Sequence, residues 1–382
     1  MWFDILLIIT IILFILYATI LLLYRKWFLQ LLPFTIPETF QPSVKFSIII
    51  PARNEEKNIG NCLLSIIQQN YPKYLFEIIV IDDHSIDSTN AIVTQLSKQY
   101  TNITLIKLTD ELHGKKINAY KKKAIELAIY KASGEWIITT DADCIASKNW
   151  LQSYAAFITT NDWVFIAAPV VFSKKNTILS MLQYTDFLSL QGITAASVSA
   201  GFHSMCNGAN LAYKKETFLA VNGFNDIDNI ASGDDMLLMN KVKNVFPNKI
   251  GFLFSKDAII TTHPMPNWKN FLNQRIRWAS KADKFKEKSI LGVLILVYLF
   301  NLILFIFPFI ALFYHNAILY LIIFLLLKIL IELFFLIPVG KFFNGHFIQW
   351  FVLLQPIHIS YTVIAGWLGK FGSYEWKERK VK

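Results

Sequence analysis

The 382-residue sequence predicts an α/β domain with a largely parallel sheet, carried by transmembrane helices at both ends. Two observations lead to this prediction. Strand and helix patterns alternate from about residue 44 to residue 288, and long uncharged apolar runs flank that section on both sides. The composition agrees, because 54% hydrophobic residues and 32 phenylalanines are more than an ordinary soluble protein carries.

The first apolar run, residues 5–23, contains no charged residue. As a helix rising about 1.5 Å per residue, it would span a hydrocarbon core of roughly 30 Å. A cleaved signal peptide is disfavoured, because no basic residue precedes the run and no small-residue cleavage site follows it. Arg25 and Lys26 come directly after the run, so the positive-inside rule places the middle section in the cytoplasm. The chain is therefore expected to be an integral protein of the cell (inner) membrane.

The middle section alternates between two kinds of pattern. Short buried strands are predicted at residues 46–50, 76–81, 103–108 and 135–140, and helices at residues 55–70, 87–100 and 115–131. Asn54 is a candidate N-cap, with Glu55 and Glu56 in the first turn of its helix. This order predicts parallel strands joined by helical crossovers.

Polar residues follow three of these strands, at the sheet edge where open α/β sheets bind ligands. They are Pro51-Ala52-Arg53, Asp82-Asp83 and Asp141-Ala142-Asp143. The turn after the first strand has no glycine and no P-loop motif occurs, which argues against a dinucleotide-binding Rossmann domain. Asp141 and Asp143 are alternate residues, so both can face a Mg²⁺ or Mn²⁺ ion that also takes water and phosphate oxygens.

Taken in order, these pieces resemble the membrane-bound family 2 glycosyltransferases with a GT-A (Rossmann-like) fold. That family includes cellulose, chitin and hyaluronan synthases and ceramide glucosyltransferase. The resemblance covers about residues 46–278. It is carried by Ser-Ile-Ile-Ile-Pro-Ala-Arg-Asn-Glu at 47–55, Asp82-Asp83, Gly114-Lys115, Asp141-Ala142-Asp143, Gly208-Ala209-Asn210, Asp234-Asp235 and Gln274-x-x-Arg277-Trp278.

The resemblance implies a nucleotide-sugar donor site, with UDP as the expected nucleotide. The base and ribose would lie beside Pro51, Ala52, Glu55, Asp82 and Asp83. The phosphates would lie near Lys115, and Asp141 and Asp143 would hold Mg²⁺ or Mn²⁺ against the departing diphosphate. For Asp82, a purely local role in the turn after its strand is an equally good interpretation.

The resemblance also implies how the acceptor reacts. Asp235 would be the general base that deprotonates the acceptor hydroxyl, and attack opposite the diphosphate would invert the anomeric centre. The family more often has Glu-Asp at this point, so no role is assigned to Asp234. Gln274, Arg277 and Trp278 would complete the site. Arg277 would pair with the pyrophosphate, and Trp278 would stack on an acceptor sugar or lipid head group.

Three more apolar segments follow, at residues 290–314, 317–339 and 347–367. Lys328 and Glu332 stand four apart and are expected to pair on one helix face. The last segment contains Gln355, Pro356 and His358, so we interpret it as re-entrant or interfacial. The predicted ranges are a transmembrane anchor at 1–26, a GT-A domain at 44–266, an interfacial amphipathic helix at 267–288, a transmembrane region at 289–369 and a basic cytoplasmic tail at 370–382.

The net charge of +10 indicates a surface that rests on anionic lipid rather than on nucleic acid. Residues 121–123, three lysines, are predicted to form a solvated helix face, and the three cysteines are expected to be reduced thiols. The expected partners are a nucleotide-sugar donor, a lipid or polysaccharide acceptor and the membrane. The alternative is a non-catalytic membrane scaffold or partner subunit of a polysaccharide synthesis complex, although the intact acids argue against it.

Overall fold

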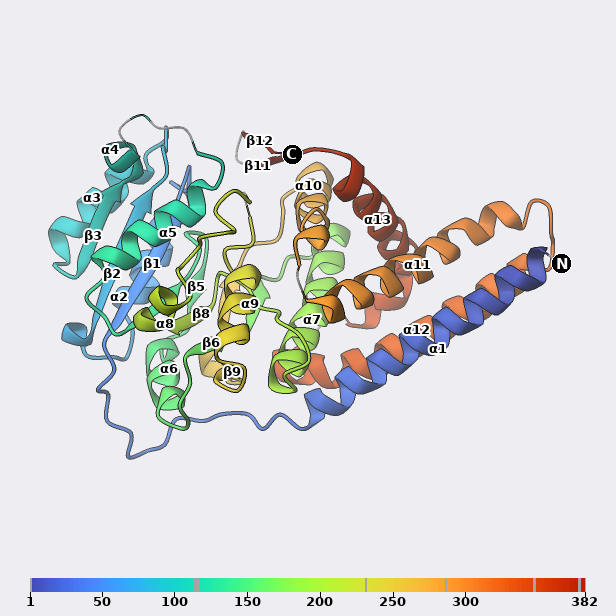
Figure 1. Ribbon diagram of the computed structural model, residues 1–382, viewed down its shortest axis with the longest axis horizontal. Helices are drawn as coiled ribbons and strands as arrows, with labels where there is room; N and C mark the ends of the chain where they lie inside the picture. Colours follow the sequence, from blue (N-terminus) through green and yellow to red (C-terminus); the bar gives the residue numbers. More distant parts are fainter. Residues whose placement is uncertain are drawn as a thin grey trace. The chain divides into compact units, whose positions relative to one another are not determined.

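The computed structural model describes residues 2–112, 114, 117–230, 232–285, 287–345, 348–376 and 379–381. The chain forms two compact units, coloured along the sequence in Figure 1. The α/β unit contains Leu32–Phe172 and Ser204–His263, and the helical unit contains Met1–Leu31, Ser173–His203 and Pro264–Lys382. The α/β unit is thus smaller than the domain range predicted from sequence, because Ser173–His203 belongs with the helices.

A seven-stranded sheet, in the order β3-β2-β1-β4-β8-β6-β9, is the centre of the α/β unit. β1 is parallel to β2 and β4, and β2 is parallel to β3, whereas β8 is antiparallel to β4 and β6. The predicted α/β class with a mostly parallel sheet is confirmed. The strands are β1 (Phe46–Ala52), β2 (Phe76–Asp82), β3 (Ile103–Lys107), β4 (Trp136–Thr139), β6 (Phe165–Ala167), β8 (Leu211–Lys214) and β9 (Ile250–Phe252).

A smaller three-stranded sheet, in the order β5-β10-β7, completes this unit. Its strands are β5 (Ile145–Ala146), β10 (Ile260–Thr262) and β7 (Val170–Phe172). The helices of the α/β unit are α2 (Ile59–Ile67), α3 (Thr89–Gln99), α4 (Leu108–Leu112), α5 (Tyr120–Lys131), α6 (Trp150–Ile158), α8 (Lys215–Ala220) and α9 (Met236–Val245). Since α5 packs on β1 and β2, its amino end lies near the sheet.

Close packing between β1 and β4 places the first acids of the site. Phe46, Ile48 and Ile50 of β1 are fully buried, as expected for a strand with parallel neighbours on both sides. A Cβ atom on Gly134, just before β4, would lie 2.5 Å from the backbone nitrogen of Ser47. Any side chain at position 134 would collide with β1, so only glycine lets the chain enter β4 here. Asp141 follows two residues after β4 ends, so this close packing also positions Asp141.

The turn after β1 differs from the sequence prediction. Asn54 has φ 51°, and its side-chain oxygen accepts a hydrogen bond from the backbone N–H of Ile86 at 3.0 Å. The backbone N–H of Glu55 donates to the Thr89 hydroxyl at 2.7 Å. The N-cap prediction for Asn54 is wrong, because asparagine tolerates the left-handed region and here joins the turns that follow β1 and β2.

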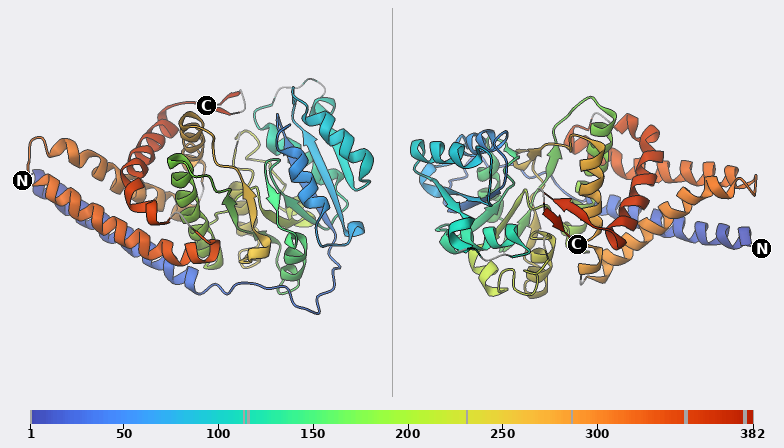
Figure 2. Two further views of the ribbon diagram at one scale, coloured as in Figure 1. Left: turned by 180° about the vertical axis from the view of Figure 1, so that it is seen from behind. Right: turned by 90° about the horizontal axis from the view of Figure 1, so that it is seen from above.

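The helical unit contains four helices in the described part that are long and apolar enough to cross a membrane. They are α1 (Trp2–Leu29), α11 (Lys288–Ile310), α12 (Ala317–Phe343) and α13 (Phe351–Phe371) with the turn before it. Figures 1 and 2 show α1 lying along α12. The unit also contains α7 (Ile178–Ser199), α10 (Trp268–Ala279), β11 (Tyr374–Trp376) and β12 (Arg379–Val381).

The polar residues of α12 and α13 meet inside the bundle. The predicted pair is confirmed, with the Lys328 ammonium 2.7 Å from Oε1 of Glu332. Gln355 is fully buried, accepts from Lys328 at 2.8 Å and donates to Glu332 at 2.7 Å, and Tyr17 of α1 also donates to Glu332. α13 continues through Pro356. Gln355, one of the residues that suggested a re-entrant segment, therefore has its hydrogen-bond partners inside the bundle.

Candidate active site

One lysine joins two of the predicted acids. The Lys121 ammonium, in the first turn of α5, lies 2.8 Å from Oδ1 of Asp141 and 3.2 Å from Oδ2 of Asp234. Asp141 follows β4, and Asp234 directly precedes the cap of α9. The side chains of Asp141, Lys121 and Asp234 keep 36%, 20% and 12% of their surface exposed. The fold therefore gathers a half-open cluster of charges from three distant points of the chain.

The charge of this lysine is fixed by its neighbours. Burial alone would lower the pKa of Lys121, but the carboxylates of Asp141 and Asp234 outweigh burial and raise that pKa above its ordinary value. Lys121 therefore stays protonated at neutral pH and presents a positive charge beside Asp141.

The solvated face predicted for residues 121–123 is wrong for its first two members. Lys122 is 1% exposed, and its ammonium donates to the carbonyl oxygens of Ile227 and Ile230 at 2.6 and 2.9 Å. It thereby holds the segment that leads to Asp234. Only Lys123 lies at the surface, 2.7 Å from Glu126. The apolar spacing of α5 did not reveal this, because carbonyl partners from a distant loop carry no local signal.

Asp235, the predicted base, caps helix α9. Its Oδ1 accepts from the backbone N–H of Met236 at 2.7 Å, and its Oδ2 accepts from the backbone N–H of Gly208 at 3.2 Å. These two backbone donors fix the orientation of the Asp235 carboxylate at the amino end of α9. A Cβ atom on Gly208 would lie 3.3 Å from Oδ2 of Asp234, so glycine leaves room for the acid pair.

Asp141 and Asp143 fit the chemistry of a hard divalent cation. Both offer carboxylate oxygens, and Thr262 donates to Oδ2 of Asp143 at 3.2 Å. The hydrogen bonds of Asp141 within the described residues use Oδ1 and leave Oδ2 available. No group of three or more acidic, histidine or cysteine side chains in that part of the chain could hold a metal alone. A bound ion would therefore complete its shell with water and phosphate oxygens, as Mg²⁺ commonly does.

Two buried thiols lie against the same turn. Cys62 donates to the carbonyl oxygen of Asp141 at 3.6 Å, and Cys144 lies next to Asp143. Both are free, as predicted for reduced thiols. Burial, with the nearby aspartates, raises the pKa of both thiols. They are therefore poor nucleophiles and weak metal ligands at neutral pH.

The residues predicted to border the nucleotide base lie at the ends of β1 and β2. Asp82 uses both carboxylate oxygens locally, accepting from the Ser85 N–H and from the Asn90 amide, each at 3.2 Å. This geometry favours the local structural role for Asp82. Asp83 lies 2.8 Å from the His84 ring, and both aspartates are buried. Nearby, Ala52 is buried, Pro51 is half-buried, and the Glu55 carboxylate accepts from Asn58 at 2.8 Å.

Three of the remaining predicted residues belong to the helical unit. Gln274, Arg277 and Trp278 are half-buried on α10, and their spacing places them on one helix face. α10 belongs to the helical unit, whereas the acids belong to the α/β unit. Lys115 lies outside the described residues.

Two family models match the sequence of this chain. A model of "Glycosyl transferase family 2" matches residues 47–218, and one of "Glycosyl transferase family group 2" matches residues 136–339, more than half of the chain. Glycosyltransferase AglE of Haloferax volcanii is 30% identical over 145 residues, which are 38% of this chain and 45% of that protein. Probable glycosyltransferase YdaM of Bacillus subtilis is 28% identical over 250 residues, 63% of this chain and 56% of that protein. The chain thus spans about half the length of these relatives.

A solved structure shares the fold. Mannosyltransferase PcManGT from Pyrobaculum calidifontis, in complex with GDP-Man and Mn²⁺, superposes with a TM-score of 0.59 at 17% identity. The match covers 95% of this chain and 96% of that chain. The predicted GT-A-like sheet with long apolar helices at both ends is therefore confirmed.

Proposed function

Because the chain belongs to glycosyltransferase family 2, we propose that it is an inverting, divalent-metal-dependent transferase that moves a sugar from UDP to a hydroxyl group presented at a membrane. One observation carries the proposal. The Lys121 ammonium lies between Asp141 and Asp234, at 2.8 and 3.2 Å, and so links the proposed metal-binding acid to the residue that directly precedes the proposed base Asp235.

The donor end consists of Asp141, Asp143 and Lys121. The two aspartates would hold Mg²⁺ or Mn²⁺, which supplies Lewis-acid stabilisation of the leaving diphosphate. Lys121 adds a fixed positive charge beside Asp141, where the diphosphate gains negative charge as the glycosidic bond breaks. This is the role predicted from sequence for Lys115.

The acceptor end is Asp235. Its carboxylate is held by the N–H groups of Gly208 and Met236, and it accepts the proton of the acceptor hydroxyl as that oxygen attacks the anomeric carbon. Attack comes from the face opposite the diphosphate, so an α-linked donor gives a β-linked product. Because Asp235 is the N-cap of α9, its hydrogen bond from the Met236 N–H keeps the carboxylate in one orientation.

The helical unit supports a membrane-presented acceptor, either a lipid or a growing polysaccharide. With the four candidate membrane helices of its described part in a bilayer, α10 would lie at a lipid surface, where Arg277 would pair with the pyrophosphate and Trp278 would stack on the acceptor. Arg25 and Lys26 at the end of α1 favour a cytoplasmic position for the α/β unit, where nucleotide sugars are available.

The test is nucleotide release by the purified protein in nanodiscs that contain a membrane-lipid extract from the source cells. UDP-sugars and GDP-mannose are screened with Mg²⁺, with Mn²⁺ and with EDTA. We expect release with one UDP-sugar, abolished by EDTA and lowered about 10²- to 10⁴-fold by Asp235→Asn. Asp162→Asn is the matched control, because this carboxylate is 67% exposed and lies outside the acid cluster.

Each result separates one part of the proposal. A product of retained anomeric configuration would overturn inversion, and release that persists in EDTA would overturn the metal requirement. No release from any donor, together with no binding of UDP, would favour the non-catalytic scaffold.

A further inference from the structure

α10 carries a second arginine, Arg275, between Gln274 and Arg277 of the motif. Arg275 is 5% exposed, whereas the motif residues around it are half-buried. Its guanidinium donates to the Gln274 side-chain oxygen at 3.3 Å and lies 4.3 Å from the centre of the Trp278 ring. A residue that the motif leaves unspecified therefore touches two of its three specified side chains.

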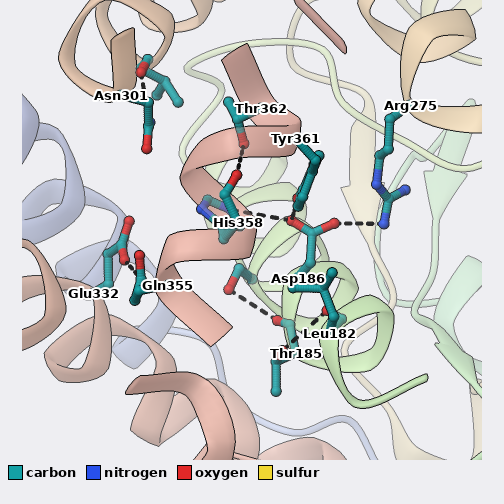
Figure 3. A network of polar contacts seen from close by, with 12 residues as sticks. Leu182, Thr185, Asp186, Arg275, Asn301, Glu332, Gln355, His358, Tyr361 and Thr362 are labelled. Carbon is teal, nitrogen blue, oxygen red and sulfur yellow. Dashed lines mark hydrogen bonds and ion pairs between the residues drawn. The ribbon is translucent and has the colours of Figure 1, made fainter. Parts of the chain in front are cut away.

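Asp186 of α7 is the anchor of Arg275. Its Oδ2 accepts from Arg275 at 2.6 Å, and its Oδ1 accepts from the Tyr361 hydroxyl at 2.6 Å (Figure 3). The His358 ring lies 3.5 Å from the same Oδ1. Burial would raise the pKa of Asp186, but Arg275 and His358 outweigh burial and lower it to about 2. One ionised carboxylate thus ties α7, α10 and α13 together.

The Trp278 ring is held by neighbours from two helices. Arg275 covers the ring from α10, and Phe187, next to Asp186 on α7, approaches it with a centroid distance of 6.4 Å. Phe271 of α10 packs on Tyr361 at 5.0 Å, and Arg275 lies 4.8 Å from the Phe271 ring. The orientation of Trp278 therefore depends on where Arg275 is fixed, and Asp186 fixes it.

A buried ion pair is a poor source of stability, because desolvation of both charges cancels much of their attraction, and apolar residues of similar volume often serve as well. The arginine at this point also stacks on an aromatic ring and binds an amide, which an apolar side chain could not do. We therefore attribute the Arg275–Asp186 pair to the orientation of neighbouring side chains rather than to stability.

We propose that Arg275 and Asp186 are positioning residues that orient Gln274 and Trp278 to receive the acceptor. This inference rests on the proposed function, since it gives Trp278 the acceptor-stacking role. It assigns neither Arg275 nor Asp186 a contact with substrate. Loss of the pair should impair sugar transfer to the acceptor far more than hydrolysis of the donor by water.

The test is a double-mutant cycle with Arg275→Gln, Asp186→Asn and the double variant, in nanodiscs with and without the membrane-lipid extract. Two rates are measured with the UDP-sugar found by the release screen: transfer of labelled sugar to lipid, and UDP release without the extract. We expect each of the three variants to lower the ratio of transfer to release roughly 10- to 100-fold, as for a displaced reacting group.

Thermal unfolding separates positioning from stability. Each single variant leaves one buried charge of the Arg275–Asp186 pair without the other and should lower Tm, whereas the double variant should regain part of that loss and keep the low ratio. Tyr361→Phe removes the hydroxyl that donates to Asp186 and should lower the ratio by a smaller factor. This variant keeps the test decisive even if the other variants fold poorly. The matched control is Glu332→Gln, a buried partner in the α12 pair, which should lower Tm and leave the ratio unchanged.

An unchanged ratio in Tyr361→Phe and in the double variant would overturn the inference, as would a double variant that recovers transfer together with Tm. If the wild-type protein turns over no donor at all, the proposed function fails, and this inference fails with it. If the wild type is active and only the ratio is unmoved, the inference alone fails.

Discussion

In the α/β unit, Asp141 keeps 36% of its side chain exposed while it contacts Lys121, whereas in the helical unit Lys328 and Arg275 keep 0% and 5%. The cluster in the α/β unit has two carboxylates, Asp141 and Asp234, around the single ammonium of Lys121. Oδ2 of Asp141 therefore remains available to a ligand. In the second unit, Asp186 and Glu332 each have both carboxylate oxygens hydrogen-bonded. Charged side chains that are partly exposed and incompletely hydrogen-bonded are suited to substrate binding. Buried charges whose hydrogen bonds are all made are suited to holding helices in place.

The largest effect is expected at Asp235. Asp235→Asn keeps one oxygen that can accept from the Met236 N–H, so the cap of α9 survives, whereas the hydrogen bond from the Gly208 N–H and the base are lost. UDP release should fall about 10²- to 10⁴-fold, with only a small decrease in Tm. Release and Tm are measured on the same nanodisc preparation. Activity close to that of the wild type would place the base elsewhere.

In the helical unit, the largest effect should be on stability. Lys328→Met leaves the Glu332 carboxylate buried without its ammonium partner, and should cost about 3–5 kcal/mol. Lys328→Met combined with Glu332→Leu should recover most of that loss. Denaturant unfolding measures both, and UDP release per folded molecule should not change. A single variant that unfolds like the wild type would mean that the pair is not a structural device.

A smaller effect is expected at Lys121. Lys121→Met removes the ammonium beside Asp141, and the donor KM should rise roughly 10- to 100-fold, as for loss of a charged hydrogen bond. Lys123→Met is the control, since this neighbouring lysine is 41% exposed and pairs with Glu126 of the same helix. Steady-state kinetics against donor concentration measures both variants. A donor KM of Lys121→Met equal to that of the wild type would mean that Lys121 does not contact the donor phosphates.

The smallest effect is predicted for pH. Because the folded-state pKa of Asp186 is depressed to about 2, the stability from its pairing is present above the unfolded pKa of roughly 4 and is lost as pH falls through the folded value. The Tm difference between wild type and Asp186→Asn should therefore be constant from about pH 6 to pH 9 and shrink only below about pH 4. A difference that changes near neutral pH would contradict this assignment to Asp186.

Much of the α/β unit could be predicted from sequence because its signals are local. The apolar runs at 46–50 and 76–81 became β1 and β2, and the acids after β4 stand where predicted. Asn54 was misassigned, since its capping pattern is local but its partner, the N–H of Ile86, comes from the next turn of the sheet. The four apolar helices were likewise evident from length and composition.

The positions of the strands and of the long apolar helices follow from local sequence, because periodicity and apolar length are properties of neighbouring residues. Which charged side chains are available to a ligand depends on the tertiary fold. Lys121 became a site residue because Asp141 and Asp234 converge on it, and Gln355 became an interior residue because Lys328 and Glu332 face it. Arg275 and Arg277 are two residues apart on one helix, yet Arg275 is buried and Arg277 is half-buried for the same reason. Desolvation and pairing depend on partners brought from distant parts of the chain, which no local pattern records.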